Sequence, residues 1–183
     1  MNEPGFVVWF TGLSGSGKTT IAVELEKELL NRGLRVQRLD GDIVRKSLTR
    51  DLGFSVEDRN KNIERITFVT RLLAKHGIAT LVSFISPFIS ARDNARNEVN
   101  EEKAKFVEVF VKASVEECTK RDVKGLYEKA IAGEIKNFTG VSHPYEEPPK
   151  AEIICNTECE TIEESTKIVI KYLEKEKLIP NSI

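Results

Sequence analysis

Residues that build metal centres are scarce in this sequence. Among its 183 residues are three cysteines and two histidines. The cysteines, Cys118, Cys155 and Cys159, form an odd set without CxxC spacing, and only His76 and His143 could complete a ligand set. We therefore predict no structural zinc and interpret the cysteines as buried or half-buried thiols.

Long apolar runs and blocks of one charge are also missing. The apolar stretches fall well short of the roughly 20 residues that cross a bilayer, and the N-terminal stretch MNEPGFVVWF has no basic n-region. The 28 basic and 29 acidic side chains nearly cancel and are mixed along the chain, which argues against nucleic-acid binding. We predict a cytoplasmic protein with no membrane or nucleic-acid partner, in which any polyanion binds in a local pocket.

The sequence does contain short β-branched or aromatic runs that alternate with longer amphipathic stretches, a pattern typical of βαβ units around a parallel sheet. A 40% share of hydrophobic residues favours a single domain over residues 1–183. The predicted strands are 6–11, 35–39, 79–85, 106–111 and 151–155. The predicted helices are 21–33 and 56–77, each ended by a glycine, 114–122 with a capping box of Ser114 and Glu117, and 161–177.

A complete phosphate-binding motif follows the first predicted strand. GLSGSGKT, residues 12–19, matches GxxxxGK[ST] and precedes a predicted helix. Its glycines allow backbone N–H groups to approach phosphate oxygens, Lys18 neutralises β/γ charge, and the Thr19 hydroxyl can bind Mg²⁺. The motif predicts a nucleoside triphosphate site and leaves open whether the protein is a hydrolytic switch or a kinase. The residues assigned to this site are Gly12, Leu13, Ser14, Gly15, Ser16, Gly17, Lys18, Thr19 and Thr20.

Two acids follow the second predicted strand. Asp40 and Asp42, in LDGD, lie at the carboxyl edge of the predicted sheet, where open α/β folds place ligands. There they can organise Mg²⁺ or accept a proton from an attacking hydroxyl, and a solvated turn is the alternative. An aromatic ring and anion-binding groups follow, which favour an anionic, ring-bearing acceptor over solvated helix charges: Arg45, Phe54, Arg59 and Asn62. Since the sequence lacks the NKxD motif of switch GTPases, a small-molecule kinase fits better.

The third predicted strand closes on LVSFISPF, residues 81–88, where many nucleotide-hydrolysing folds carry an acid. Three roles for Ser86 stay open: contact with substrate, capping of the turn before Pro87, or a covalent phosphoserine, which would need an adjacent base. Residues 123–150 contain three glycines and three prolines outside the main pattern. We predict a lid there that excludes water from the bound substrates, with a helical hairpin as the alternative.

As a group these residues resemble the adenylyl-sulfate kinase family. The resemblance rests on GLSGSGKT, LDGD, LGFSVEDRNKNIERI, SFISPF, RDVKGLYEKAIAGEIKNFTG and PYEEP in this order, and it runs from about Val8 to the closing helix. It implies a three-layer α/β P-loop kinase fold with a five-stranded parallel sheet, helices on both faces and a lid. It also implies phosphorylation of the 3′-hydroxyl of adenosine 5′-phosphosulfate by Mg-ATP, giving 3′-phosphoadenylyl sulfate and ADP, in a homodimer with a functional link to ATP sulfurylase.

The resemblance implies a role for each matching residue. Lys18, Asp40, Ser86 and Lys124 are the catalytic set, and Thr19 and Asp40 hold the metal. The remaining assignments are to substrate: sulfate- and phosphate-facing contacts at Arg45, Arg59 and Asn62, adenine-stacking rings at Phe54 and Phe138, further contacts at Ile85 and Ser86, the substrate edge at Asp42, and a lid lysine at Lys124.

Two positions depart from the family pattern. Ile43 stands where the family usually has asparagine in DGDN, and Ile89 follows SFISPF where an arginine or another polar residue is common. Neither change touches Lys18, Asp40 or Arg59, so we expect activity to be retained. The alternatives are another small-molecule or nucleotide kinase of the same fold and a catalytically inactive nucleotide-binding regulatory module.

Overall fold

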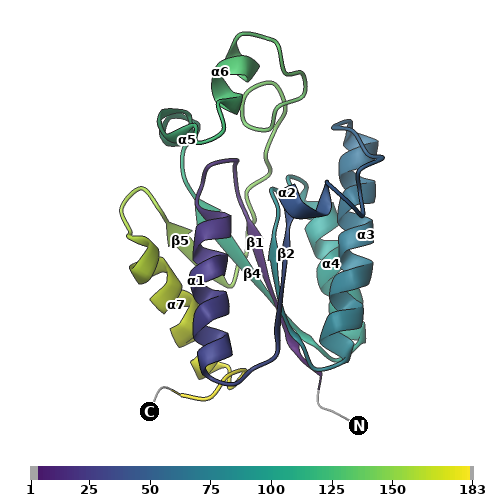
Figure 1. The fold of residues 1–183 in the computed structure, drawn as a ribbon, viewed down its shortest axis with the longest axis vertical. Helices are drawn as coiled ribbons and strands as arrows, with labels where there is room; N and C mark the ends of the chain where they lie inside the picture. The colour runs from purple at the N-terminus through teal and green to yellow at the C-terminus, as the bar shows by residue number, and fades with distance from the viewer. Residues whose placement is uncertain (1–3, 182–183) are drawn as a thin grey trace.

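A computed structural model describes residues 4–181 and contains one parallel sheet (Figure 1). Its strands are β1 (Phe6–Thr11), β2 (Val36–Asp40), β3 (Ala79–Ser83), β4 (Lys105–Lys112) and β5 (Ile153–Asn156). They are hydrogen-bonded in the order β2-β3-β1-β4-β5, and every neighbouring pair is parallel. The predicted five-stranded parallel sheet is confirmed.

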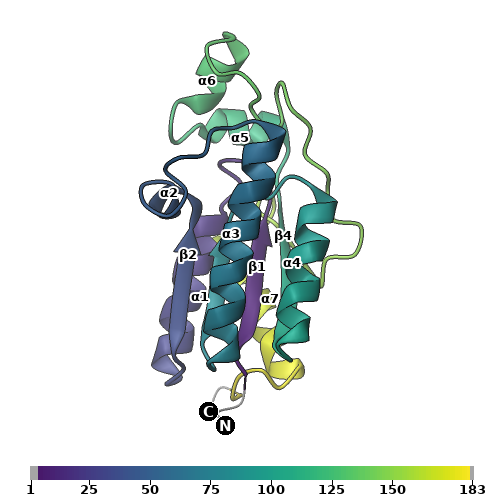
Figure 2. The same ribbon diagram turned by 90° about the vertical axis from the view of Figure 1, so that its right-hand side faces the viewer.

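Helices cover both faces of this sheet. They are α1 (Lys18–Asn31), α2 (Gly41–Val44), α3 (Val56–Lys75), α4 (Ile89–Glu101), α5 (Val115–Arg121), α6 (Leu126–Ile131) and α7 (Ile162–Lys175). Helices α1 and α7 pack on one face and α3 and α4 on the other, which gives the predicted three layers (Figures 1 and 2). The short helices α5 and α6 stand above the carboxyl edge of the strands (Figure 1).

The central strand β1 explains why two helical layers are needed. All six of its residues are buried, and alternate side chains point to opposite faces. Val8 and Phe10 belong to the core beneath α1 and α7, whereas Val7 and Trp9 belong to the core beneath α3 and α4. Because both faces of β1 are apolar, only the carboxyl edge of the sheet is left to carry polar groups.

Most predicted helix ends are confirmed, but one predicted capping hydrogen bond is made to a different residue. Gly33 and Gly77 follow α1 and α3 with positive φ angles of 79° and 75°. The Ser114 hydroxyl caps α5 by accepting a hydrogen bond from the N–H of Glu117 (3.2 Å). The predicted capping box is nevertheless wrong in its second half, because the N–H of Ser114 donates to the Glu158 carboxylate (2.5 Å).

Several boundaries and one helix differ from the predictions. Strand β2 runs one residue further than expected and ends on Asp40, while β3 ends at Ser83 rather than residue 85. Helix α4 was not predicted, and α6 lies inside the predicted lid, residues 123–150. Cys159 is exposed in the turn after β5, contrary to expectation, whereas Cys118 and Cys155 are buried. Within residues 4–181, no helix is both long and apolar enough to cross a membrane.

Candidate active site

One cavity of about 570 Å³ opens at the carboxyl edge of the sheet. It joins the N-terminus of α1, helix α2, the first turns of α3, the segment after β3 and the lid. Most of the predicted site residues line it: Ser14, Gly15, Gly17, Lys18, Thr19, Thr20, Asp40, Asp42, Arg45, Phe54, Arg59, Asn62, Ile85, Ser86, Lys124 and Phe138. Gly12, Leu13 and Ser16 were also predicted at the site but do not line this cavity.

The phosphate loop, residues 12–19, has a backbone that only glycine tolerates at two points. Gly12 has φ of 147°, and a Cβ added there would lie 2.4 Å from the carbonyl oxygen of Val111 on β4. Gly17 is the N-cap of α1 with φ of 102°. These positions hold the loop against the sheet and direct the N-terminus of α1 into the cavity, which suits an anionic ligand.

Lys18 is buried at the base of this loop. Its side chain is 8% exposed in the folded protein, and Nζ donates hydrogen bonds to the carbonyl oxygens of Gly12 (3.0 Å) and Leu13 (2.7 Å). Burial lowers the pKa of Lys18 to about 8, against the opposing influence of the acids at 40 and 42. A bound triphosphate would favour the charged form of this lysine.

Thr19 and Asp40, the two candidate metal ligands, lie next to each other. The Thr19 hydroxyl donates to Asp40 Oδ2 (2.8 Å), although the two residues lie on α1 and β2. Asp40 Oδ1 accepts the N–H of Asp42 (3.0 Å) and so caps α2. A hydroxyl and a carboxylate at the mouth of a phosphate loop are oxygen ligands of the kind Mg²⁺ takes, so these residues fit the ion.

Arg59 connects α3 to the lid. Its guanidinium donates from Nη1 to Thr139 Oγ1 (2.8 Å) and from Nη2 to the carbonyl of Asn137 (2.5 Å). A third bond runs from Nε to the carbonyl of Phe54 (3.0 Å). Burial, followed by the nearby Arg45 charge, lowers the pKa of Arg59, but an arginine stays charged at neutral pH. This buried cation gives the cavity a basic end.

An aromatic ring and an unpaired amide stand beside that arginine. Phe54 is 56% exposed, and the guanidinium of Arg45 lies 4.4 Å from the centroid of its ring. Asn62 is buried, and its Oδ1 has no hydrogen-bond partner within the described part of the chain. Because a buried acceptor without a partner costs free energy, this atom indicates a ligand with a hydrogen-bond donor.

The lid reaches across the cavity mouth to α2. Lys124, in the segment between α5 and α6, forms an ion pair with Asp42. The two side chains are 51% and 65% exposed, so the pair contributes only about 0–1 kcal/mol and can open readily. Deeper in the lid, Phe138 packs edge-on against Tyr127, with 4.9 Å between ring centroids. This contact helps to fix Phe138 where it lines the cavity.

Some lining residues were not identified from the sequence. Six of them come from the lid: Val123, Leu126, Ile135, Lys136, Asn137 and Thr139. Another feature that was not identified supports the phosphate loop from outside: Arg121 at the end of α5 donates to the Thr157 carbonyl (2.7 Å) and the Gly15 carbonyl (3.4 Å). The pairing of Arg121 with Thr157 joins segments 36 residues apart, so no local pattern could have found it.

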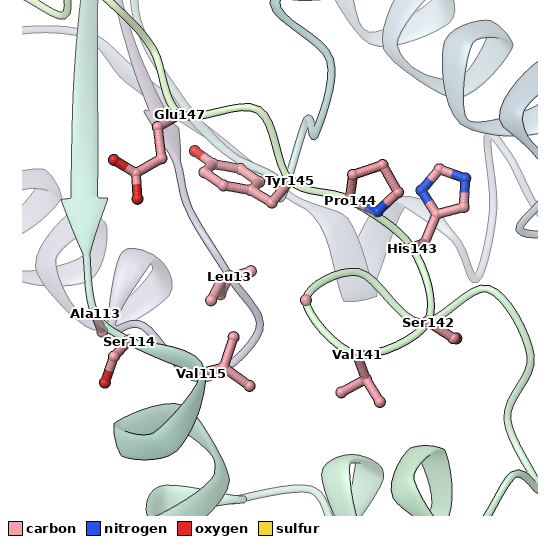
Figure 3. Close-up of a pocket in the computed structure, with 11 residues that line it drawn as sticks. Leu13, Ala113, Ser114, Val115, Val141, Ser142, His143, Pro144, Tyr145 and Glu147 are labelled. Atoms are coloured by element: carbon pink, nitrogen blue, oxygen red, sulfur yellow. The ribbon is translucent and has the colours of Figure 1, made fainter.

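A second pocket, of about 490 Å³, lies beside Leu13 of the phosphate loop (Figure 3). Leu13, Val115 and Val141 surround it, with Tyr145 and Glu147 at one side. Among the predicted site residues, Leu13 alone lines it, and the charged and anion-binding side chains described above line the larger cavity. The larger cavity is therefore the candidate active site.

A phosphate loop with a buried lysine, a paired hydroxyl and carboxylate, and a basic, aromatic compartment partly lined by residues 123–139 together define a P-loop phosphotransferase. The chain belongs to the adenylylsulphate kinase family, whose model matches residues 4–156. It is 58% identical to the probable adenylyl-sulfate kinase of Pseudomonas aeruginosa, over 93% of this chain and 78% of that protein.

Solved structures agree with this assignment. The Mycobacterium tuberculosis APS kinase CysC in complex with AMPPNP and APS matches with a TM-score of 0.91 and 43% identity, covering 94% of this chain and 99% of that one. The hexameric APS kinase from Thiobacillus denitrificans matches with a TM-score of 0.73 and 32% identity, over 97% of this chain and 30% of that one. The predicted family and P-loop kinase fold are confirmed.

Proposed function

We propose that this protein transfers the γ-phosphoryl group of ATP to the 3′-hydroxyl of adenosine 5′-phosphosulfate, giving 3′-phosphoadenylyl sulfate and ADP. One observation carries the proposal: a single cavity is lined by the phosphate loop, by Asp40, and by an arginine- and phenylalanine-bearing compartment that includes Arg45, Arg59, Phe54 and Phe138. We call residues 12–20 the donor half, and Asp42, Arg45, Phe54, Arg59, Asn62, Ile85, Ser86, Lys124 and Phe138 the acceptor half.

The donor half binds and orients the triphosphate. The loop N–H groups and Lys18 contact its β/γ oxygens, and Thr19 and Asp40 would hold Mg²⁺, which supplies charge neutralisation between those oxygens. Because phosphoryl transfer passes through a loose transition state, positioning and charge contribute more than covalent assistance. Lys124 brings a second ammonium from the lid to the same phosphates.

The acceptor half orients the sulfated nucleotide. Phe54 and Phe138 stack on its adenine, while Arg45 and Arg59 bind the phosphosulfate oxygens with their planar guanidinium groups. In the transfer step the 3′-oxygen forms a bond to the γ-phosphorus and its proton passes to the Asp40 carboxylate. The bond from the γ-phosphorus to the bridging oxygen breaks, and ADP keeps that electron pair.

The direct test is ADP release measured with adenosine 5′-phosphosulfate, with AMP and with no acceptor, with product separated by chromatography. We expect release to depend on the sulfated acceptor and to disappear in Lys18→Met, which controls for contaminating kinases. Equal release without acceptor would contradict transfer. Equal use of AMP would favour another nucleotide kinase, and nucleotide binding without turnover would favour a regulatory module.

We also propose a homodimer and a supply of acceptor by ATP sulfurylase, as the family resemblance implies. Light scattering coupled to size-exclusion chromatography measures the first directly, and a mass corresponding to a 20.6 kDa monomer would contradict it. Adding an ATP sulfurylase with sulfate and ATP should replace added adenosine 5′-phosphosulfate in the ADP-release assay.

A further inference from the structure

The turn after β3 contains a strained residue. Ser86 has φ of +40°, a conformation that a serine seldom adopts. It also lines the active-site cavity, next to Ile85. Backbone strain of this kind persists only where the surroundings hold it in place, so the contacts around Ser86 are informative.

Two side chains of strand β1 hold this turn. The indole N–H of Trp9 on β1 donates to Ser86 Oγ (3.0 Å), and Ser86 Oγ donates to the carbonyl of Phe84 (3.3 Å). The hydroxyl of Thr11, also on β1, donates to the carbonyl of Ile85 (2.8 Å). Ser86 is 2% exposed. Its hydroxyl is therefore engaged both as donor and as acceptor inside the protein.

Arg92 on α4 makes the contact that fixes the backbone of the turn. Its Nη1 donates to the carbonyl of Ser86 (2.6 Å), and its Nη2 donates to the carbonyl of Glu146 (2.8 Å), near the end of the lid. The guanidinium is 2% exposed and is neutralised by Glu108 on β4, whose Oε1 accepts from Nε (2.7 Å). One buried cation thus joins the turn, the sheet and the end of the lid.

A second residue, Tyr145, holds the end of the lid at the same place. The ring of Tyr145 lies 5.8 Å from the Arg92 guanidinium, and its hydroxyl hydrogen-bonds with Thr11 Oγ1 (2.9 Å). Figure 3 shows the Tyr145 ring lying between Glu147 and Pro144 along this segment. Thr11 therefore contacts both the Ser86 turn and the end of the lid.

We propose that Arg92 is a positioning residue for the acceptor half: it holds the Ser86 turn in its strained conformation and keeps the end of the lid in register with it. The Ser86 hydroxyl then serves as part of this support and not as a nucleophile. The inference rests on the proposed function, because the acceptor half is defined by it. It assigns a role to a residue that touches neither substrate nor metal.

The test compares Arg92→Lys with Arg96→Lys. Arg96 lies one turn further along α4 and binds the same Glu108 as well as Glu152, but its hydrogen bonds do not reach the turn or the lid. In Arg92→Lys we expect KM for adenosine 5′-phosphosulfate to rise about tenfold or more while KM for ATP stays within about twofold. In Arg96→Lys both values should stay within about twofold. Equal changes in the two variants, or parallel changes in both KM values, would overturn the proposal.

Trp9 provides a readout that does not depend on turnover. It is the single tryptophan of the chain, so the intrinsic fluorescence reports on the residue that donates to Ser86 Oγ. We expect an altered emission spectrum in Arg92→Lys and an unaltered one in Arg96→Lys, at a temperature where both are folded. If the unaltered protein failed to use the sulfated acceptor, the proposed function would fall, whereas this spectrum would still test the support of the turn.

A third comparison tests whether relief of backbone strain at Ser86 restores acceptor binding. In the Arg92→Lys background, Ser86→Gly and Ser86→Ala both remove the hydroxyl, but only glycine adopts a positive φ freely. The glycine variant should therefore show the lower acceptor KM, by about threefold or more. If Arg92→Lys does not fold, Glu108→Gln takes its place, since it keeps the shape and removes the charge that neutralises Arg92. Equal acceptor KM values for glycine and alanine would contradict the positioning of a strained turn.

Discussion

The donor half of the cavity comes from one unbroken segment, residues 12–20, whereas the acceptor half is assembled from α2, α3, the turn after β3 and the lid. The donor half is fixed by local backbone geometry: Gly12 meets the Val111 carbonyl of the neighbouring strand, and Lys18 bonds to the carbonyls of its own loop. The acceptor half depends on contacts between distant residues, such as Arg59 with Thr139.

This difference separates two requirements of a phosphotransferase. Triphosphate binding needs a rigid cradle, which a short motif can encode. Binding an acceptor and then excluding water needs parts that move relative to one another, and these must come from different segments. The exposed pair of Lys124 and Asp42 fits that need, because it contributes little free energy when formed and costs little to break.

Asp40 lies where the two halves meet, so its substitution should affect turnover much more than ATP binding. Asp40→Asn keeps an oxygen that can cap α2 but removes the negative charge beside Thr19. We expect turnover to fall by about 10²–10⁴-fold, as for loss of a general base, while ATP affinity measured by calorimetry changes less than about threefold. Asp42→Asn, at the exposed mouth, is the control and should lose much less. Turnover within a few-fold of the unaltered protein would show that Asp40 is not the organising acid.

Phe54 tests the acceptor half alone. Phe54→Leu removes the exposed ring that lies against Arg45, and base–aromatic stacking contributes about 1–3 kcal/mol. We therefore expect KM for adenosine 5′-phosphosulfate to rise by about 5- to 150-fold with KM for ATP unchanged. Phe68→Leu is a matched control, because Phe68 is a similarly exposed ring (53%) that faces Arg71 and does not line the cavity. Equal effects of the two substitutions would remove Phe54 from the site.

The same difference explains how much the sequence could reveal. The phosphate loop was predictable because its eight residues interact largely with one another and with the strand and helix that flank them. Asp40 was predictable because parallel strands all end at one edge. Helix α4 was missed because its inward face carries small residues and a cation, namely Ala95, Val99 and Arg92, which do not form a clear apolar stripe.

Contacts between segments far apart in the sequence escaped prediction for a physical reason. Arg92 and Glu108 are charged residues that look solvent-exposed in the sequence, yet they are buried because each neutralises the other. Their pairing depends on how α4 lies against β4, which no local spacing specifies. Arg59 was predicted as a substrate contact from its residue type near LDGD and again from the family resemblance, but its bonds to Asn137 and Thr139 became visible only in the folded chain.

The pH dependence of ATP binding tests the role of Lys18 in the donor half. Burial lowers its pKa to about 8 in the folded protein, and the negative charge of a bound triphosphate raises it again. Above pH 8 the free protein has lost this proton, so ATP binding must take one up, and affinity should fall by up to about tenfold per pH unit. Calorimetry between pH 7 and 9.5, in buffers with different ionisation enthalpies, measures both the affinity and the proton uptake. Lys18→Arg should bind without this proton uptake, and a flat profile in the unaltered protein would contradict the assignment.

Ile43 lies outside the acceptor half, although Asp42 and Arg45 on either side of it belong to that half. It stands in the position where the family usually has asparagine, but its side chain is 59% exposed and does not line the cavity, whereas its neighbour Asp42 does. Residue 43 can therefore contribute to the site only through the backbone of α2. Ile43→Asn should change KM for adenosine 5′-phosphosulfate by less than about twofold and the free energy of unfolding by no more than about 0.5 kcal/mol. Paired kinetic and thermal-unfolding measurements on the two proteins check both values. A tenfold gain in acceptor affinity would instead show that α2 turns the side chain of residue 43 inward when substrate binds, and that this residue belongs to the acceptor half.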